Sequence, residues 1–293
     1  MSAAAYAETA AVEKSPGYWA GVVTRFRRDP VAMIALAVIL ALVLMAVFAP
    51  LVAPADPYRT SMLRRLRPIG TAGFPLGADE LGRDMLSRLI YGARLSLLMG
   101  VTPVIIAFFV GSAIGITAGY TGGRINTVLM RTIDVFFAFP SVLLAIALSG
   151  AMGAGIFNGL LSLTIVFIPP IARIAESVTT AVRKIEYVEA ARASGAPALT
   201  IIRRHVLGNV LGPVFVYATG LISVSLILAS GLSFLGLGVK PPEPEWGLML
   251  NTLRNAIYVQ PWVAALPGAM IFITSISFNL LADGLRSAMD IKA

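Results

Sequence analysis

The chain has 293 residues, of which 57% are hydrophobic and 13% charged, and its formal net charge is +8. This apolar content exceeds the roughly 45–50% of soluble domains, so the composition predicts an integral membrane protein. The absence of cysteine excludes disulfides and thiol chemistry. The basic residues gather at the ends of apolar runs, which indicates anchoring at lipid headgroups and argues against a nucleic-acid-binding face.

Residues 1–30 form a mixed-charge segment that precedes the first apolar run, and that run is longer than the roughly 7–15 residues of a cleavable signal. We therefore expect an uncleaved N-terminal segment in the cytosol. Uncharged runs occupy residues 30–55, 95–123, 135–172, 205–239 and 255–282. Each exceeds the roughly 20 residues that cross a bilayer core.

The third uncharged run is too long for one span and is interrupted near its middle by Gly150, Gly153, Gly155, Asn158 and Gly159. We therefore predict an all-α membrane protein, with one transmembrane domain over residues 31–293. About six helices are expected, centred on residues 31–53, 95–119, 128–149, 158–174, 210–232 and 263–283.

Two long connectors, at residues 54–93 and 233–262, are predicted to lie outside the cell. In the first, the helical spacing of Met85, Leu86, Leu89 and Ile90 predicts a short separate helix over 84–91. In the second, four prolines enforce turns. The basic clusters at 25–28 and 183–204 favour cytosolic termini under the positive-inside rule, although the first outer connector is itself unusually basic.

Small residues recur along one face of the second predicted helix, where Gly111, Gly115 and Gly119 are four residues apart. Such a face lets another helix approach closely. A helix of this chain is the favoured partner, and a helix of another subunit is the alternative.

Polar side chains mark the fifth and sixth predicted helices. They could line a translocation path, or they could make interhelical hydrogen bonds worth about 0.6 kcal/mol each. The residues are Ser223, Ser225, Thr274, Ser275, Ser277 and Asn279.

A polar interruption separates the fourth and fifth helices within a cytosolic loop predicted over 175–209. Residues 186–194 favour a helix, Gly195 suits the left-handed residue that ends it, and Pro197 suits the first position of the next. From spacing alone, this is either an element that contacts a cytosolic partner or an ordinary amphipathic connector.

The interruption reads Glu189-Ala190-Ala191, then Gly195, then Arg204-His205-Val206-Leu207 before Asn209, and it resembles the EAA loop of ABC importer permeases. The wider resemblance is to the C-type subunit of the dipeptide/oligopeptide/nickel permease family. It rests on the segments 76–84, 91–96, 119–123 and 233–238, followed by Pro241-Pro242 and Trp246-Gly247. The chain departs from the family at Gly208, where proline is usual, and at its ending, 286–291.

This resemblance implies a type I importer permease fold in the bacterial plasma (inner) membrane. It also implies a second homologous permease, two ATP-binding subunits that carry ATP and Mg, and an extracytoplasmic substrate-binding protein. Short peptides are the expected cargo, with nickel or a nickel chelate, glutathione and opine-like compounds left open. The residues implied to contact the ATPase are Glu186, Glu189, Ala190, Ala191, Arg192 and Gly195.

Catalytic and cofactor-binding patterns are missing from the sequence. None of the four lysines follows glycine, so the chain has no phosphate-binding Walker A sequence. His205 is the only histidine, and no carboxylate set within a span predicts a metal site or proton relay. We expect no enzyme activity and no bound cofactor. The alternatives are a self-contained secondary transporter or channel, which would need such groups, and a membrane scaffold.

Overall fold

The computed structural model describes residues 18–290, and the regular elements over this range are helices. Residues 1–17 of the predicted N-terminal segment and residues 291–293 of the predicted domain lie outside it. Two short 3-10 helices, Met62–Arg64 and Ala256–Tyr258, lie in the connectors, and the π-helical segment Ile202–Val206 joins α9 to α10 in one continuous helix. The α-helices are α1 Tyr18–Arg27, α2 Pro30–Val47, α3 Ala49–Val52, α4 Met85–Thr121, α5 Gly123–Phe137, α6 Ser141–Met152, α7 Ile156–Val182, α8 Glu186–Ala193, α9 Ala198–Ile201, α10 Leu207–Phe234, α11 Trp246–Thr252 and α12 Pro261–Met289.

Five of these helices are long and apolar enough to cross a membrane, and the bent pair α5–α6 brings the number to six if it is one span. The prediction of an all-α membrane protein with about six spans is confirmed. The first span begins where expected, because the side chain of Asp29 accepts hydrogen bonds from the N–H groups of Val31 and Ala32 at 2.9 and 3.2 Å. It ends earlier than expected, at Val47, and the short α3 follows.

Residues 84–91 do not form a separate helix, so that prediction was wrong. They are the start of α4, which continues for 37 residues, a length of about 55 Å. Asp84 caps this helix by accepting a hydrogen bond from the N–H of Ser87 at 2.7 Å. The helical spacing of buried residues that begins at Met85 and Leu89 continues at Ala93 and Ser96, so the segment is part of one uninterrupted helix.

The third predicted span, 128–149, is not one straight helix. Helices α5 and α6 meet at 86° across the break at residues 138–140. Pro140 lacks an N–H and disfavours helical geometry at Phe139, which explains the break. The interruption expected after Gly150 is present: α6 ends at Met152, Gly153 has φ +84°, and α7 begins at Ile156.

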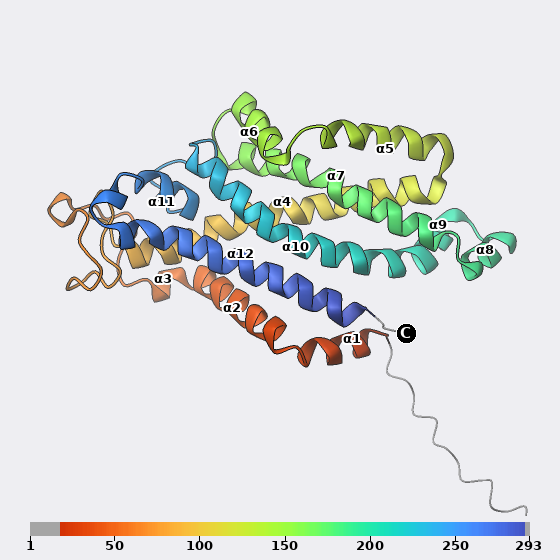
Figure 1. The fold of residues 1–293 in the computed structure, drawn as a ribbon, viewed down its shortest axis with the longest axis horizontal. Helices are drawn as coiled ribbons and strands as arrows, with labels where there is room; N and C mark the ends of the chain where they lie inside the picture. The colour runs from red at the N-terminus through yellow and green to blue at the C-terminus, as the bar shows by residue number, and fades with distance from the viewer. Residues whose placement is uncertain (1–17, 291–293) are drawn as a thin grey trace, which may run out of the picture.

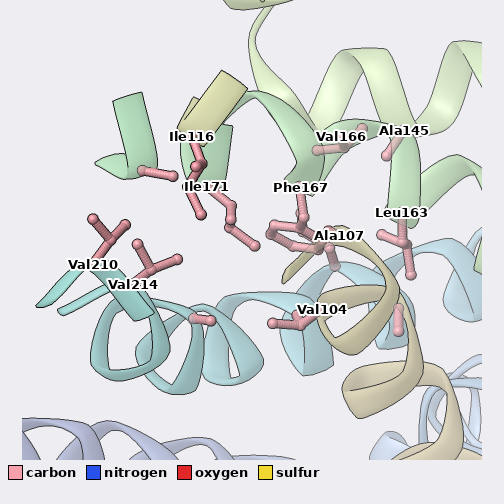
Figure 2. Close-up of a cluster of buried hydrophobic side chains, with 14 of the residues drawn as sticks. Val104, Ala107, Ile116, Ala145, Leu163, Val166, Phe167, Ile171, Val210 and Val214 are labelled. Atoms are coloured by element: carbon pink, nitrogen blue, oxygen red, sulfur yellow. The ribbon is translucent and has the colours of Figure 1, made fainter. Parts of the chain in front are cut away.

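The long helices α4, α7, α10 and α12 run side by side, and α2 packs on the outer flank of α12 (Figure 1). Apolar side chains from α4, α6, α7 and α10 form the main core (Figure 2). Helices α1, α8 and the end of α12 lie at the right-hand end of Figure 1, and the Nε of Arg25 donates to the carbonyl of Ala288 there at 2.7 Å. We call this the α8 end. The two long connectors lie at the opposite end, the connector end.

Candidate functional site: the α8 loop and its supports

Helix α8 is a short element between the much longer α7 and α10, and its ending follows from local chemistry. Gly195 adopts φ +79°, a left-handed conformation that favours glycine. The N–H of Ala196 donates to the carbonyl of Ala191 at 3.2 Å, and that of Gly195 donates to Arg192 at 3.0 Å. This pair of bonds is a Schellman motif. It fixes a sharp turn into α9, which begins directly after Pro197.

One side of α8 is anchored to the rest of the protein and the other is free. The Val188 side chain is fully buried in the main core, and the Arg192 guanidinium lies over the Tyr120 ring at 5.7 Å. The opposite face, formed by Glu186, Glu189, Ala190 and Ala193, is exposed. We call these four residues the α8 face. Two carboxylates in the first turn also match the positive end of the helix dipole.

Some of the residues predicted to contact the ATPase lie on the exposed side of α8, and others lie on its anchored side. Glu186, Glu189 and Ala190 lie on the exposed face, and Gly195 is exposed at the turn beyond it. Ala191 is half-buried against the core, and Arg192 reaches toward α4. Tyr187, which the sequence did not single out, accepts a hydrogen bond from Asn209 at 3.0 Å and thereby ties α8 to α10.

The glycine face of α4 lies directly against α7, a helix of the same chain. A Cβ atom built on Gly111, Gly115 or Gly119 would lie 2.9, 2.3 or 2.7 Å from the backbone carbonyl of Ile168, Ala172 or Glu176, respectively. Only residues without a Cβ permit this approach. Because α7 continues toward α8, the glycine face fixes the helix that carries the loop.

The polar residues of the last two spans are mostly buried between helices. Thr274 and Ser277 donate to carbonyls one turn earlier in α12, and Ser275 lies 3.5 Å from the carbonyl of Ser223 on α10. Ser223 and Ser225 are buried as well, and Asn279 alone of the six is exposed. The Ser225 hydroxyl is buried without a hydrogen-bond partner. Path lining by these residues therefore stays a prediction, with contacts within and between helices as its alternative.

An ion-pair network at the connector end was missed by sequence reasoning. Arg83 and Arg88 both pair with Asp79, at 2.6 and 3.2 Å, and all three side chains are buried. Arg88 also donates to the carbonyl of Pro57 at 3.0 Å. Asp79 and Arg83 lie inside segment 76–84, which carries part of the family resemblance, and Arg88 lies beyond it, but their pairing depends on how the connector folds.

The second connector packs against the same end through two adjacent buried residues, Glu245 and Trp246, which both contact α4. The indole N–H of Trp246 donates to the carbonyl of Leu89 at 3.0 Å, and Ser96 donates to Glu245 at 3.2 Å. Burial raises the pKa of the Glu245 carboxyl, while hydrogen bonds from Gly247 and Leu248 oppose this shift. The two connectors thus form one packed cap over the helix ends.

A second charged contact joins α5 to α7. Arg131 and Asp134, three positions apart on α5, form an ion pair at 3.8 Å in which the Arg131 side chain is 80% exposed. Asp134 also pairs with Arg173, from which it is separated by 39 positions in the chain. Helical spacing identifies pairs within a helix, so this contact between helices had no signal in the sequence.

The packed helices and the bent pair α5–α6 define a multi-pass membrane protein. The fold resembles a solved chain titled "Inward facing conformations of the MetNI methionine ABC transporter: CY5 native crystal form", with a TM-score of 0.56 and 19% identity. The match covers 70% of this chain and 97% of that one. This likeness concerns the fold alone.

Residues 111–292 match the family model described as binding-protein-dependent transport system inner membrane component. Residues 17–68 match the N-terminal TM domain of oligopeptide transport permease C. The chain belongs to the first of these families and is a permease subunit of an ABC importer, not an enzyme. The predicted family and the absence of enzyme function are thereby confirmed.

Three relatives match nearly the whole chain. The glutathione transport system permease protein GsiD of Pectobacterium atrosepticum is 40% identical over 94% of this chain and 91% of its own. The di/tripeptide transport system permease protein DppC of Pseudomonas aeruginosa is 41% identical over 91% and 90%. The probable D,D-dipeptide transport system permease protein DdpC of Escherichia coli K12 is 38% identical over 94% and 92%.

Proposed function

We propose that this chain forms one half of the translocation path of an importer for short peptides. Its partners are a second homologous permease, two ATP-binding subunits that carry ATP and Mg, and an extracytoplasmic substrate-binding protein. The names of the three relatives support the cargo class, because glutathione, di- and tripeptides and D,D-dipeptides are all short peptides. The chain binds no cofactor of its own and makes or breaks no bond of the cargo.

The α8 face is the observation that carries this proposal. An exposed helix of eight residues, anchored on one side by Val188 and Arg192, suits insertion into a groove of an ATP-binding subunit. Ala190 allows close approach, and Glu189 offers a charge-assisted contact. Because α8 is joined to α7 and α10, its displacement on ATPase closure would be passed to two spanning helices.

The orientation follows from the same element. If α8 meets an ATP-binding subunit in the cytosol, the start of α1 and the end of α12 are cytosolic too, because they share its end of the molecule (Figure 1). Residues 1–30 then form a cytosolic segment, the α8 loop faces the cytosol, and both connectors face outward. This arrangement places the connector cap where a substrate-binding protein can reach it.

Uptake of labelled dialanine into proteoliposomes tests the proposal. We expect uptake only when both permeases, the ATP-binding subunits, the substrate-binding protein and ATP are present. A self-contained transporter or channel would instead carry the peptide when this chain alone is reconstituted with an ion gradient. Uptake by this chain alone, or failure of the full complex to accumulate dialanine, glutathione or any other short peptide, would contradict the proposal.

A further inference from the structure

Three charged side chains, two on α5 and one on α7, form a cluster near the bend between α5 and α6. Asp134 pairs with Arg173 and has Arg131 at 3.8 Å, and the side chains of Asp134 and Arg173 are 39% and 42% exposed. Both helices belong to candidate membrane spans. Ionisable residues within spans are costly and face a bundle interior or a water-filled cavity, so each is a candidate functional group.

A cavity of about 250 Å³ lies one helical turn from this pair. Phe137 follows Asp134 by three positions on α5, and Pro169 and Pro170 precede Arg173 by four and three on α7, so they share helix faces with the charged residues. The aromatic side chains at the bend form much of its wall. The lining residues include Phe136, Phe137, Phe139, Ser141, Phe167 and Pro170.

Helix α7, which forms part of the cavity wall, also contains backbone acceptors that lack their usual helical donors. Pro169 and Pro170 have no N–H, so the carbonyls of Ile165 and Val166 lose the bonds that a regular helix would give them. Val166 lines the cavity. A peptide cargo carries N–H groups that can donate to such carbonyls, and small-molecule sites combine apolar walls with a few polar groups of this kind.

The cluster of Arg131, Asp134 and Arg173 carries a net charge of +1, and the carboxylate of Glu176 nearby on α7 is hydrogen-bonded to other residues. Asp134 has one negative charge and lies between two arginines. Glu176, one turn further along α7, accepts hydrogen bonds from Asn126 at 2.7 Å and from Thr180 at 3.1 Å. A carboxylate that reached the cavity could therefore replace Asp134 on Arg173, because a guanidinium binds carboxylates through paired N–H groups.

We propose that this cavity and the Arg131–Asp134–Arg173 cluster form a subsite for the free C-terminal carboxylate of the peptide in transit. Arg173 exchanges Asp134 for the cargo carboxylate, and the aromatic wall accommodates the adjoining residue. The proposal rests on the proposed peptide import and adds to it the chemical group that this chain recognises. No bond is made or broken in this exchange.

Protection of an introduced thiol tests the subsite without the substrate-binding protein. The parent chain has no cysteine, so Ser141→Cys in the purified complex without ATP places the only thiol of this chain at the cavity. Any thiols of the partner subunits are first replaced. We expect dialanine at millimolar concentration to slow modification by a maleimide several-fold, whereas the C-terminal amide of dialanine has little effect.

The variant Asp134→Asn/Arg173→Gln removes both charges of the pair together, and it should abolish this protection. The matched control Asp283→Asn/Arg286→Gln removes an exposed pair on α12, whose atoms are 3.7 Å apart, and should retain it. Equal protection by peptide and amide, no protection by either, or protection that survives loss of the Asp134–Arg173 pair would overturn the subsite. Uptake of dialanine by the parent complex, measured separately, tells whether the import proposal itself has failed.

Discussion

Replacing Gly115 by leucine is expected to prevent stable folding of this permease. The first added carbon would lie 2.3 Å from the carbonyl oxygen of Ala172 and 2.6 Å from the Cβ of Ala175, so α4 and α7 would have to separate. Overpacking costs about 1–3 kcal/mol in well-packed cores, and contact with a backbone atom places this site at the upper end. The measurement is the amount of folded complex in membranes, together with its thermal stability in detergent.

Gly150→Leu is the matched control for this variant, because it also places leucine at a helical glycine. Position 150 on α6 is exposed, and a built Cβ meets no atom within 4 Å. The control should accumulate like the parent. If Gly115→Leu accumulates and melts like the control, the close packing of α4 on α7 does not support the fold as described.

Glu189→Lys is expected to abolish transport while leaving the membrane domain folded. The residue lies on the exposed α8 face, so its replacement disturbs no core packing. In a docked complex, losing a hydrogen bond to a charged group costs about 1.5–3 kcal/mol, or roughly 10- to 150-fold in affinity, before repulsion is added. The measurement is peptide uptake together with ATPase activity stimulated by the substrate-binding protein.

Asp283→Lys reverses a charge at an exposed position of α12 and serves as the control, with membrane expression reporting folding in both variants. It should transport like the parent. Unchanged ATPase stimulation in Glu189→Lys would reduce Glu189 to a solubilising residue of the loop. Loss of expression would instead make it structural and contradict its placement on a free surface.

The spans and the ending of α8 could be predicted because they depend on local chemistry. Runs of uncharged residues identify helices of bilayer length, and Gly195 followed by Pro197 specifies a left-handed turn and a new helix start. The close approach of α4 was also visible as glycines four residues apart. The sequence could not tell which helix they contact, whereas the structure places α7 there.

The prediction of a straight third span was wrong because tertiary packing decides its shape. Pro140 was available as a signal for the bend between α5 and α6, but the surrounding apolar run suggested one continuous span. The serines of α10 and α12 were ambiguous because a polar side chain within a span suits either a path or a helix contact. Ser277 donates to the carbonyl of Ile273 within its own helix, whereas the buried Ser225 hydroxyl has no hydrogen-bond partner.

Part of the unusually basic character near the first connector has a structural explanation that composition could not provide. Arg83 and Arg88 form buried ion pairs with Asp79. Arg94 donates to the carbonyls of Ala46 and Val47 at 2.6 and 3.0 Å. These arginines serve the fold at the connector end. The clusters at residues 25–28 and 183–204 are the basic groups that favour cytosolic termini, and Arg59, Arg64, Arg65 and Arg67 of the first connector oppose them.

Crosslinking from the α8 face tests the central claim most directly. Because the chain lacks cysteine, Ala190→Cys gives it a single thiol on the exposed side of α8, and a short thiol-to-amine crosslinker can report what lies against it. We predict a product with an ATP-binding subunit whose yield changes when ATP is added. Such a product would also fix α8 on the cytosolic side. Modification of this introduced thiol by an impermeant reagent from outside intact cells, without any product with an ATP-binding subunit, would contradict both the coupling and the orientation.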